Sequence, residues 1–170
     1  ATYKVGDKTV IAVDGDDIAE ENRLSQQVQA MQSEQLDIVG SDAILINENN
    51  DVVGFRKHAH QHEQIVKRMN LTNQFVNSSL MFRKNMVQDV GLYNPKFDVS
   101  EDYEFALRAV RNKKSGNLNQ PLIRYRLRAN QVSSKKWLKS RYIMIWPKVR
   151  NIFLNPRHKI LAILYLLLSI

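Results

Sequence analysis

Short apolar runs and amphipathic segments alternate along this chain, and that alternation constrains the fold more than any other feature. The run TVIAV, residues 9–13, has the length and composition of a buried strand. From Glu20 onward, Leu24, Val28 and Met31 recur at the i, i+4, i+7 spacing that places them on one face of a helix. A strand followed at once by a helix is typical of an α/β layered domain.

Later segments continue the same alternation. LDIVGSDAILI and VVGF flank the turn-rich NENND, which predicts two extended segments joined by a hairpin-like loop. HEQIVKRM predicts a short helix, and QFVNSSLMF predicts a strand. SEDYEFALRAVR predicts a longer helix, because Tyr103, Ala106, Leu107 and Val110 fall on one face and Ser100 is a natural N-cap. The predicted fold class is α/β.

Length and composition set the outer limits. The 170 residues are about one domain, and 44% apolar with 25% charged residues is typical of a globular protein. The absence of cysteine excludes disulfides, thiolate metal ligands and a cysteine nucleophile. Residues 1–111 hold 12 Lys/Arg and 17 Asp/Glu, a net charge of −5, whereas residues 112–170 hold 13 Lys/Arg and no acid. The chain therefore combines an acidic body with a basic tail.

Three carboxylates, Asp14, Asp16 and Asp17, crowd directly behind the first apolar run. On an extended segment Asp14 and Asp16 point the same way, and carboxylates about 4 Å apart repel by roughly 4 kcal/mol at an effective dielectric constant near 20. A hard cation such as Mg²⁺ or Mn²⁺ offsets that repulsion and keeps positions open for substrate phosphates. The alternative is a solvated acidic turn that caps the following helix. A calcium EF-hand is excluded, because Ser25 stands where that loop needs its last glutamate.

A second acidic pair, Glu101 and Asp102, lies at the predicted start of the helix in SEDYEFALRAVR. A carboxylate there can serve as a general base if a neighbouring like charge raises its pKa toward the working pH. The alternative is ordinary capping, because acids favour the first turn of a helix.

Four segments follow one another between about residues 8 and 136: AVDGDD, NSSLMFRK, GLYNPKFDVSEDYEFALR and IRYRLRANQVSS. Together they resemble successive motifs of the family 2 glycosyltransferases of the GT-A type, which build bacterial cell-surface polysaccharides. The resemblance implies a GT-A-like (Rossmann-like) mixed sheet flanked by helices for residues 1–136. Residues 137–170 would form a separate basic, aromatic and apolar helical tail.

The same resemblance assigns roles to particular residues. Asp14 and Asp16 match the D-x-D motif, which binds a divalent metal ion, Mn²⁺ or Mg²⁺, on the diphosphate of the sugar nucleotide. Asp102 matches the catalytic base, and Glu101 is its companion. The residues assigned to donor or acceptor binding are Asp17, Asn77, Ser78, Ser79, Arg108 and Arg128.

The implied reaction is an inverting transfer from a nucleotide-sugar donor, a UDP-sugar first of all, to a hydroxyl of a saccharide or lipid-linked acceptor. Asp102 would remove the proton of that hydroxyl as its oxygen attacks the anomeric carbon. A metal held by Asp14 and Asp16 would neutralise the departing diphosphate. No covalent nucleophile is required, and the sequence shows neither a Ser-His-Asp arrangement nor a G-x-S-x-G pattern.

Two features depart from the family pattern. Only 13 residues precede Asp14, whereas family members carry roughly a further half-domain there, which holds the base and ribose of the donor. This predicts a domain truncated at its N-terminus, as a fragment, a truncated gene product or one part of a split enzyme. Such a chain is either the catalytic part of the transferase, with a second chain as a possible source of the missing half, or a non-catalytic membrane- or partner-binding module. Many relatives also have a histidine where this chain has Arg128, which cannot ligate a cation but can pair with phosphate.

The histidines offer a rival site. HAHQH places His58, His60 and His62 at alternate positions, and an extended strand would point all three to one side as zinc ligands. No fourth ligand is evident, and an exposed loop is the simpler interpretation.

The basic tail mixes Lys and Arg with aromatic residues and ends in the apolar run Ile160–Ile170. Eleven residues span only about 16 Å as a helix, and a bilayer core needs about 20 residues. The tail therefore predicts peripheral contact with the inner face of a membrane, in a cytoplasmic protein without a secretory signal. The alternatives are a helix packed on the domain and, since no nucleic-acid-binding motif appears, a less favoured nucleic-acid site.

Overall fold

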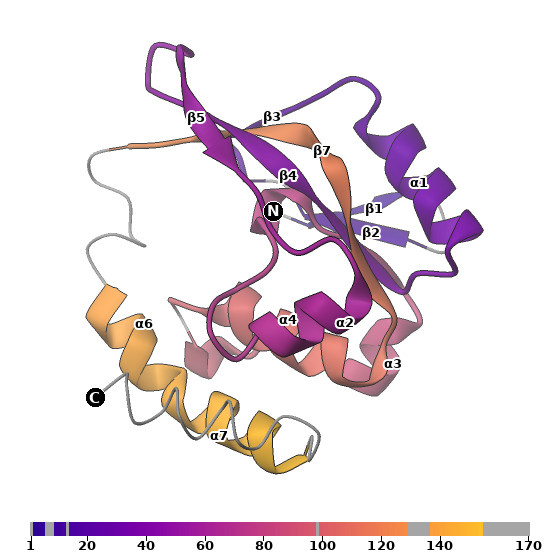
Figure 1. Cartoon of the computed structure of the whole chain (residues 1–170), viewed down its shortest axis with the longest axis vertical. Helices are drawn as coiled ribbons and strands as arrows, with labels where there is room; N and C mark the ends of the chain where they lie inside the picture. Colours follow the sequence, from indigo (N-terminus) through magenta and orange to yellow (C-terminus); the bar gives the residue numbers. More distant parts are fainter. Residues whose placement is uncertain (1, 6–8, 13, 98, 129–136, 155–170) are drawn as a thin grey trace.

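The computed structural model describes residues 2–5, 9–12, 14–97, 99–128 and 137–154 (Figure 1). The strands are β1 (Thr2–Val5), β2 (Thr9–Ala12), β3 (Ile18–Ala19), β4 (Ile38–Ile46), β5 (Val52–Arg56), β6 (Met81–Arg83) and β7 (Ser115–Arg126). The helices are α1 (Arg23–Ser33), α2 (His62–Arg68), α3 (Met86–Val90), α4 (Glu101–Asn112), α6 (Trp137–Ile143) and α7 (Ile145–Leu154), with 3-10 turns η1 (Asn77–Ser79) and η2 (Pro95–Phe97). The predicted α/β class is confirmed.

One mixed sheet organises the domain. The described strands follow the order β1-β2-β6-β4-β7-β3, and β5 pairs with β4. β4 and β7 are parallel, whereas the other described pairs are antiparallel. A parallel pair needs a long crossover, and here the crossover carries α2, β6, α3 and α4. The crossover therefore brings α4, which begins with Glu101 and Asp102, back to the sheet whose strand β2 precedes Asp14.

Helices cover both faces of the sheet. Adjacent residues of a strand point to opposite faces, so each face presents its own apolar side chains to a helix. Ile38 and Phe82 belong to an apolar cluster with Phe105 of α4. Their neighbours Val39 and Met81 belong to a second cluster that includes Met31 of α1. In Figure 1, α1 accordingly lies on one side of the strands, and α2, α3 and α4 lie together on the other.

The helix predicted after Glu20 is confirmed as α1, and its predicted apolar face is confirmed in part, because Met31 is buried and Val28 packs against its cluster. Arg23 and Gln27 are buried, while Leu24 is 41% exposed. The Arg23 guanidinium donates to the backbone carbonyls of Ala12 (3.1 Å), the last residue of β2, and Leu80 (3.3 Å), the residue before β6. Burial lowers the pKa of Arg23 to about 10. Apolar periodicity did not predict the burial of Arg23 and Gln27, because their side chains contact backbone carbonyls rather than apolar side chains.

The strand predicted over QFVNSSLMF is mostly wrong. Only Met81–Arg83 forms β6, and the 3-10 turn η1 precedes it. The Ser79 hydroxyl donates to the carbonyl of Val76 (2.8 Å) and accepts the backbone N–H of Ser41 (3.1 Å). Such local bonds between side chains and backbone compete with a strand ladder.

The longer helix is confirmed as α4, which begins after Ser100. The Ser100 hydroxyl makes no capping bond and instead contacts the Val99 carbonyl and the Ser140 hydroxyl of α6. Of the predicted face, Ala106, Leu107 and Val110 are buried and Tyr103 is half-buried. The helix therefore packs as expected along its length, but its first turn is tied to the tail.

The described part of the tail packs on this helix. Met144 is buried in the same cluster as Phe105. Arg111 donates to the side-chain oxygen of Asn151 (2.9 Å), and the Asn151 amide donates to Asn70 (2.8 Å). The apolar run Ile160–Ile170 lies outside the described residues. Among the helices described, none has both the length and the apolar character that crossing a bilayer requires.

Candidate active site

The first acidic cluster is a turn. The backbone N–H of Asp17 donates to the carbonyl of Asp14 (3.3 Å), which closes the chain between β2 and β3. The predicted extended geometry of Asp14 and Asp16 is therefore wrong. The turn brings the side chains of Asp14 and Asp17 together at Ser78, and it leaves Asp16 beside Arg128.

The Ser78 hydroxyl lies between two carboxylates. It is fully buried, 3.0 Å from Oδ2 of Asp14 and also in contact with Oδ2 of Asp17. Burial raises the pKa of Asp17, and the charges of Asp16 and Asp14 raise it further. A hydroxyl has one proton and cannot donate to both carboxylates at once. The turn therefore carries more negative charge than its own hydrogen bonds neutralise.

Arg126 holds this turn in place. Its backbone N–H donates to Oδ1 of Asp17 (2.8 Å), and its guanidinium donates to the carbonyl of Asp16 (2.9 Å). The same guanidinium reaches the β4–β5 loop at the Asn47 carbonyl (2.9 Å) and the Asn50 side chain (2.7 Å). One side chain thus joins the end of β7, the acidic turn and the hairpin tip.

We expect Arg126→Gln to lower the free energy of unfolding by about 2 kcal/mol, because hydrogen bonds to a charged donor are lost and their carbonyl acceptors are left unpaired. Urea titration followed by circular dichroism measures this. Arg128→Gln is the matched control, since its exposed ion pair with Asp16 should contribute less than about 1 kcal/mol. Equal losses in the two variants would contradict the anchoring role of Arg126.

The second acidic group lies at the start of α4. Asp102 lies in the first turn of α4, and its Oδ2 accepts the side-chain amide of Asn73 (3.2 Å). Burial raises the pKa of Asp102, and the charges of Glu101 and Asp14 raise it as well. Asp14 therefore lies within electrostatic reach of Asp102. The charge of the acidic turn thus affects the carboxyl of Asp102, although the two lie far apart in the sequence.

Tyr93 connects these groups. Its ring stacks on Phe105 at 4.7 Å, and its hydroxyl lies 3.5 Å from the side-chain oxygen of Asn77. Burial raises the pKa of Tyr93, and the charges of Asp102, Asp14 and Glu101 raise it further. The phenol therefore stays protonated at neutral pH and is available as a hydrogen-bond donor in the site.

A polar cleft opens beside the acidic turn. Arg128 pairs with Asp16 (Nε to Oδ2, 3.2 Å) and lines a cleft of about 350 Å³ together with Glu48, Asn50 and Arg126. A guanidinium at this position suits an anionic group such as phosphate.

Two of the predicted binding residues serve the fold in this geometry. The Ser79 side chain is fully buried and bonded to backbone, as described above. Arg108 binds both carboxylate oxygens of Glu104 (2.6 and 2.8 Å) and donates to the Val90 and Leu92 carbonyls. Their predicted roles in binding donor or acceptor find no support in these contacts.

The histidines do not form a zinc site. His60 bonds to Asp42 (3.2 Å), His62 bonds to Ser115 (2.8 Å), and burial lowers the pKa of His58. Within the described ranges, no group of three or more His, Cys, Asp or Glu side chains is arranged to hold a metal ion. The alternate spacing failed because the three histidines do not lie on one strand.

Three residues of the site were not predicted: Asn73, Tyr93 and Arg126. Each is a common residue type, and no spacing rule identified it. Tyr93 and Asn73 come from the long crossover between β4 and β7, and only the folded topology brings them to Asp102.

Comparisons with known proteins agree with this architecture. The chain is 32% identical over 121 residues to the O-antigen biosynthesis glycosyltransferase WbnJ of Escherichia coli, covering 69% of this chain and 47% of that protein. It is 28% identical over 154 residues to the uncharacterized glycosyltransferase MJ1057 of Methanocaldococcus jannaschii, covering 89% of this chain and 52% of that one. A scan against protein-family models gives no match. The chain spans about half the length of these relatives.

Among solved structures, the chain resembles S. aureus TarS 1–349, with a TM-score of 0.55 at 12% identity over 89% of this chain and 45% of TarS. The same part of TarS in complex with UDP-GlcNAc gives a TM-score of 0.54 at 14% identity, covering 85% and 42%. The fold is thus a GT-A-like mixed sheet flanked by helices. In sequence, this chain is a relative of proteins named glycosyltransferases.

Proposed function

We propose that this chain is the catalytic part of a metal-dependent inverting glycosyltransferase, which moves a sugar from a nucleotide-sugar donor to a hydroxyl acceptor. The observation that carries the proposal is that the charge of Asp14 raises the pKa of Asp102, although 87 residues lie between them along the chain. An inverting transfer needs both a site for the leaving diphosphate and a base for the acceptor.

Asp102 acts as the base in this proposal. It removes the proton of the acceptor hydroxyl while the hydroxyl oxygen forms a bond to the anomeric carbon and the bond to the diphosphate breaks. Its raised pKa makes it a stronger base than an exposed carboxylate. Asn73 fixes one oxygen, and Glu101 and Tyr93 complete the surroundings as a second charge and a neutral donor.

A divalent cation, Mn²⁺ or Mg²⁺, is held by Asp14 and Asp16. Asp17 is less suited, because Arg126 and Ser78 already occupy its two oxygens. Asp14 and Asp16 each have one oxygen in a described contact, and the uncompensated negative charge of the turn favours a hard cation. Such an ion supplies charge neutralisation for the diphosphate. With two carboxylates, the remaining ligands would come from the donor and water.

The donor we propose is a UDP-sugar, supported by the UDP-GlcNAc complex of TarS. The acceptor is a saccharide or a lipid-linked saccharide of a cell-surface polysaccharide, supported by the O-antigen role in the name of WbnJ. Arg128 contacts the diphosphate or an anionic acceptor in this proposal, which its position in the lining of the cleft supports. The implied location is cytoplasmic, where nucleotide sugars are supplied.

Isothermal titration calorimetry with a panel of sugar nucleotides tests this function. With Mn²⁺ present we expect saturable binding of at least one UDP-sugar, and with EDTA we expect much weaker binding, because a cation held by Asp14 and Asp16 would neutralise charge on the diphosphate. Absence of binding for every donor with either metal would contradict the proposal.

The basic tail supports a second candidate function, since residues 112–170 hold 13 Lys/Arg and no Asp or Glu. Such a tail fits a non-catalytic module, or one part of a split enzyme, that binds a membrane or a second chain. Donor binding that appears only after a partner chain is added would favour the split enzyme over the complete catalytic unit.

A further inference from the structure

The segment between α2 and η1, residues 69–75, carries the amide that contacts the proposed base. Asn73 donates from its side-chain amide to Oδ2 of Asp102 (3.2 Å), and its side-chain oxygen accepts the backbone N–H of Phe75 (3.1 Å). Both ends of the Asn73 side chain are therefore in use. The direction of its amide toward Asp102 depends on the backbone of residues 69–75.

One half of this segment is tied to the sheet. The Gln74 side-chain oxygen accepts the backbone N–H of Ala59 (3.2 Å), and the side chain of Asn117 in β7 donates to the Gln74 carbonyl (2.8 Å). Gln74 and Asn117 are both buried. These bonds fix the backbone directly after Asn73.

The other half of the segment is tied to helix α7 of the tail. The Asn151 amide donates to the side-chain oxygen of Asn70 (2.8 Å), and the Lys148 ammonium donates to the Leu71 carbonyl (3.3 Å). Asn70 and Asn151 are 6% and 3% exposed, so loss of this bond would leave a buried acceptor unpaired. Arg111 of α4 donates to the Asn151 oxygen (2.9 Å) and thereby sets the direction of the Asn151 amide.

The tail also contacts the helix that carries the proposed base. The Ser140 hydroxyl of α6 contacts the hydroxyl of Ser100, two residues before Asp102. The Lys148 ammonium lies 5.2 Å from the centre of the Tyr103 ring, and Tyr103 directly follows Asp102. The tail thus contacts both elements between which the base and its amide partner meet.

We propose that α7 belongs to the catalytic unit, with Asn151 and Lys148 as positioning residues that hold Asn73 against Asp102. This inference rests on the proposed function, in which Asp102 is the base. Neighbouring residues must hold a reacting group to within about 0.5 Å of its productive position. By fixing one carboxylate oxygen of Asp102, the Asn73 amide leaves the other oxygen to accept the proton.

Steady-state kinetics of the full chain test the inference. Asn151→Leu keeps the size of the side chain but removes its bonds to Asn70 and Arg111. We expect kcat to fall about tenfold or more and donor affinity to stay within about twofold, because a small misplacement of the base slows the reaction and the acidic turn is untouched. Asn151→Asp should restore kcat, because its carboxylate accepts from Arg111 and from the Asn70 amide once that amide turns over.

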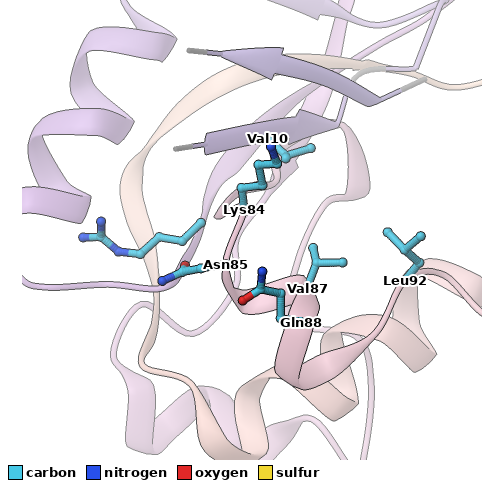
Figure 2. Close-up of a pocket in the computed structure, with 7 residues that line it drawn as sticks. Val10, Lys84, Asn85, Val87, Gln88 and Leu92 are labelled. Atoms are coloured by element: carbon cyan, nitrogen blue, oxygen red, sulfur yellow. The ribbon is translucent and has the colours of Figure 1, made fainter. Parts of the chain in front are cut away.

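Asn85→Leu is the matched control, since it makes the same substitution outside residues 69–75 and the tail. Asn85 precedes α3, and its side chain makes no capping bond. Figure 2 shows Asn85 in the lining of a separate cavity of about 690 Å³ at this helix. Its replacement should leave kcat and donor affinity unchanged.

A double-mutant cycle distinguishes positioning from a general loss of stability. If α7 acts through Asn73, then in the Asn73→Ala background Asn151→Leu should have little further effect on kcat. A general effect on the fold would instead add to that of Asn73→Ala. Lys148→Met takes the place of Asn151→Leu in the cycle if the latter does not fold, because it removes the bond to Leu71 and leaves the buried Asn70 bond in place.

The pKa of Asp102 gives a readout that needs neither donor nor acceptor. The Asn73 amide favours the ionised carboxylate, so its displacement should raise the pKa of Asp102. Carbon-13 NMR should therefore show a higher pKa of Asp102 in Asn151→Leu than in the parent chain, and no change in Asn85→Leu.

Three results, each in a variant that circular dichroism shows to be folded, would overturn the inference. They are an unchanged kcat in Asn151→Leu, additive effects in the cycle, and an unchanged pKa of Asp102. If the parent chain transfers no sugar, the proposed function fails, and the NMR measurement alone decides whether α7 holds Asn73 against Asp102.

Discussion

Asp102→Asn is expected to lower the rate of sugar transfer by about 10²- to 10⁴-fold, which is the usual contribution of a general base. The substitution keeps the size of the side chain and an oxygen that can accept the Asn73 amide, but it removes the proton acceptor. Donor affinity should stay nearly unchanged, because the metal and the diphosphate are bound at the acidic turn. Turnover with a UDP-sugar and calorimetry on the same sample measure both quantities.

Glu101→Gln is the matched control for this experiment. Glu101 is the exposed neighbour of Asp102 and acts through its charge, so the variant should lose far less activity. A loss of donor binding in Asp102→Asn as large as its loss of turnover would show that Asp102 holds the donor rather than the proton.

The pH dependence of transfer has a defined sign. The base works only when ionised, so the rate should rise with pH through the raised pKa of Asp102 and then level off.

The same raised pKa means that ionised Asp102 costs folding free energy. Its contribution is favourable below the pKa of the unfolded chain, near 3.8, and is lost as pH rises through the pKa of the folded state. The Asn variant should therefore unfold at a higher urea concentration than the parent chain at pH 7.

The second large effect concerns the acidic turn. Asp14→Asn and Asp16→Asn should each lower Mn²⁺-dependent donor affinity by at least about 100-fold, because each removes a charged ligand of a cation with only two protein ligands. Glu21→Gln, an exposed acid just beyond the turn, should have no effect. Calorimetry with and without Mn²⁺ measures the metal-dependent part.

Asp17→Asn tests whether Asp17 supports the fold of the turn or binds the metal. Both oxygens of Asp17 accept hydrogen bonds, so an amide would place an N–H group against a donor and destabilise the turn. We expect a lower free energy of unfolding and a smaller change in Mn²⁺ dependence than for Asp16→Asn. If instead Asp17→Asn abolishes the metal dependence and Asp16→Asn preserves it, then Asp17 is the ligand and our assignment of Asp16 fails.

The sequence predicted those parts of the fold in which local pattern and tertiary packing agree. The helix after Ser100 has an apolar stripe and an acidic first turn, and it forms as α4. The burial of Arg23 and Gln27 in α1 was missed because these polar side chains bond to the backbone carbonyls of Ala12 in β2 and Ser79 in η1. No periodicity of apolar residues reports such contacts.

The same distinction applies to the site. Asp14 and Asp102 were assigned from the two acidic groups together with the resemblance of the segments around them to glycosyltransferase motifs. The turn brings Asp14 together with Asp17 at Ser78 instead of with Asp16. This turn was not predicted, because its geometry depends on Arg126, which follows it by more than a hundred residues. Long-range hydrogen bonds of this kind are set by the parallel pairing of β4 with β7, which a single sequence does not encode in any local pattern.

The central claim is that the two acidic groups share one site, and the pKa of Asp102 measures it most directly. Carbon-13 NMR of the labelled side-chain carboxyl gives that pKa in the parent chain and in Asp14→Asn. Our account predicts a raised pKa in the parent chain and a lower one in the variant, because the charge of Asp14 is one cause of the shift. An identical pKa in the two proteins would place Asp14 and Asp102 in separate environments and contradict the shared site.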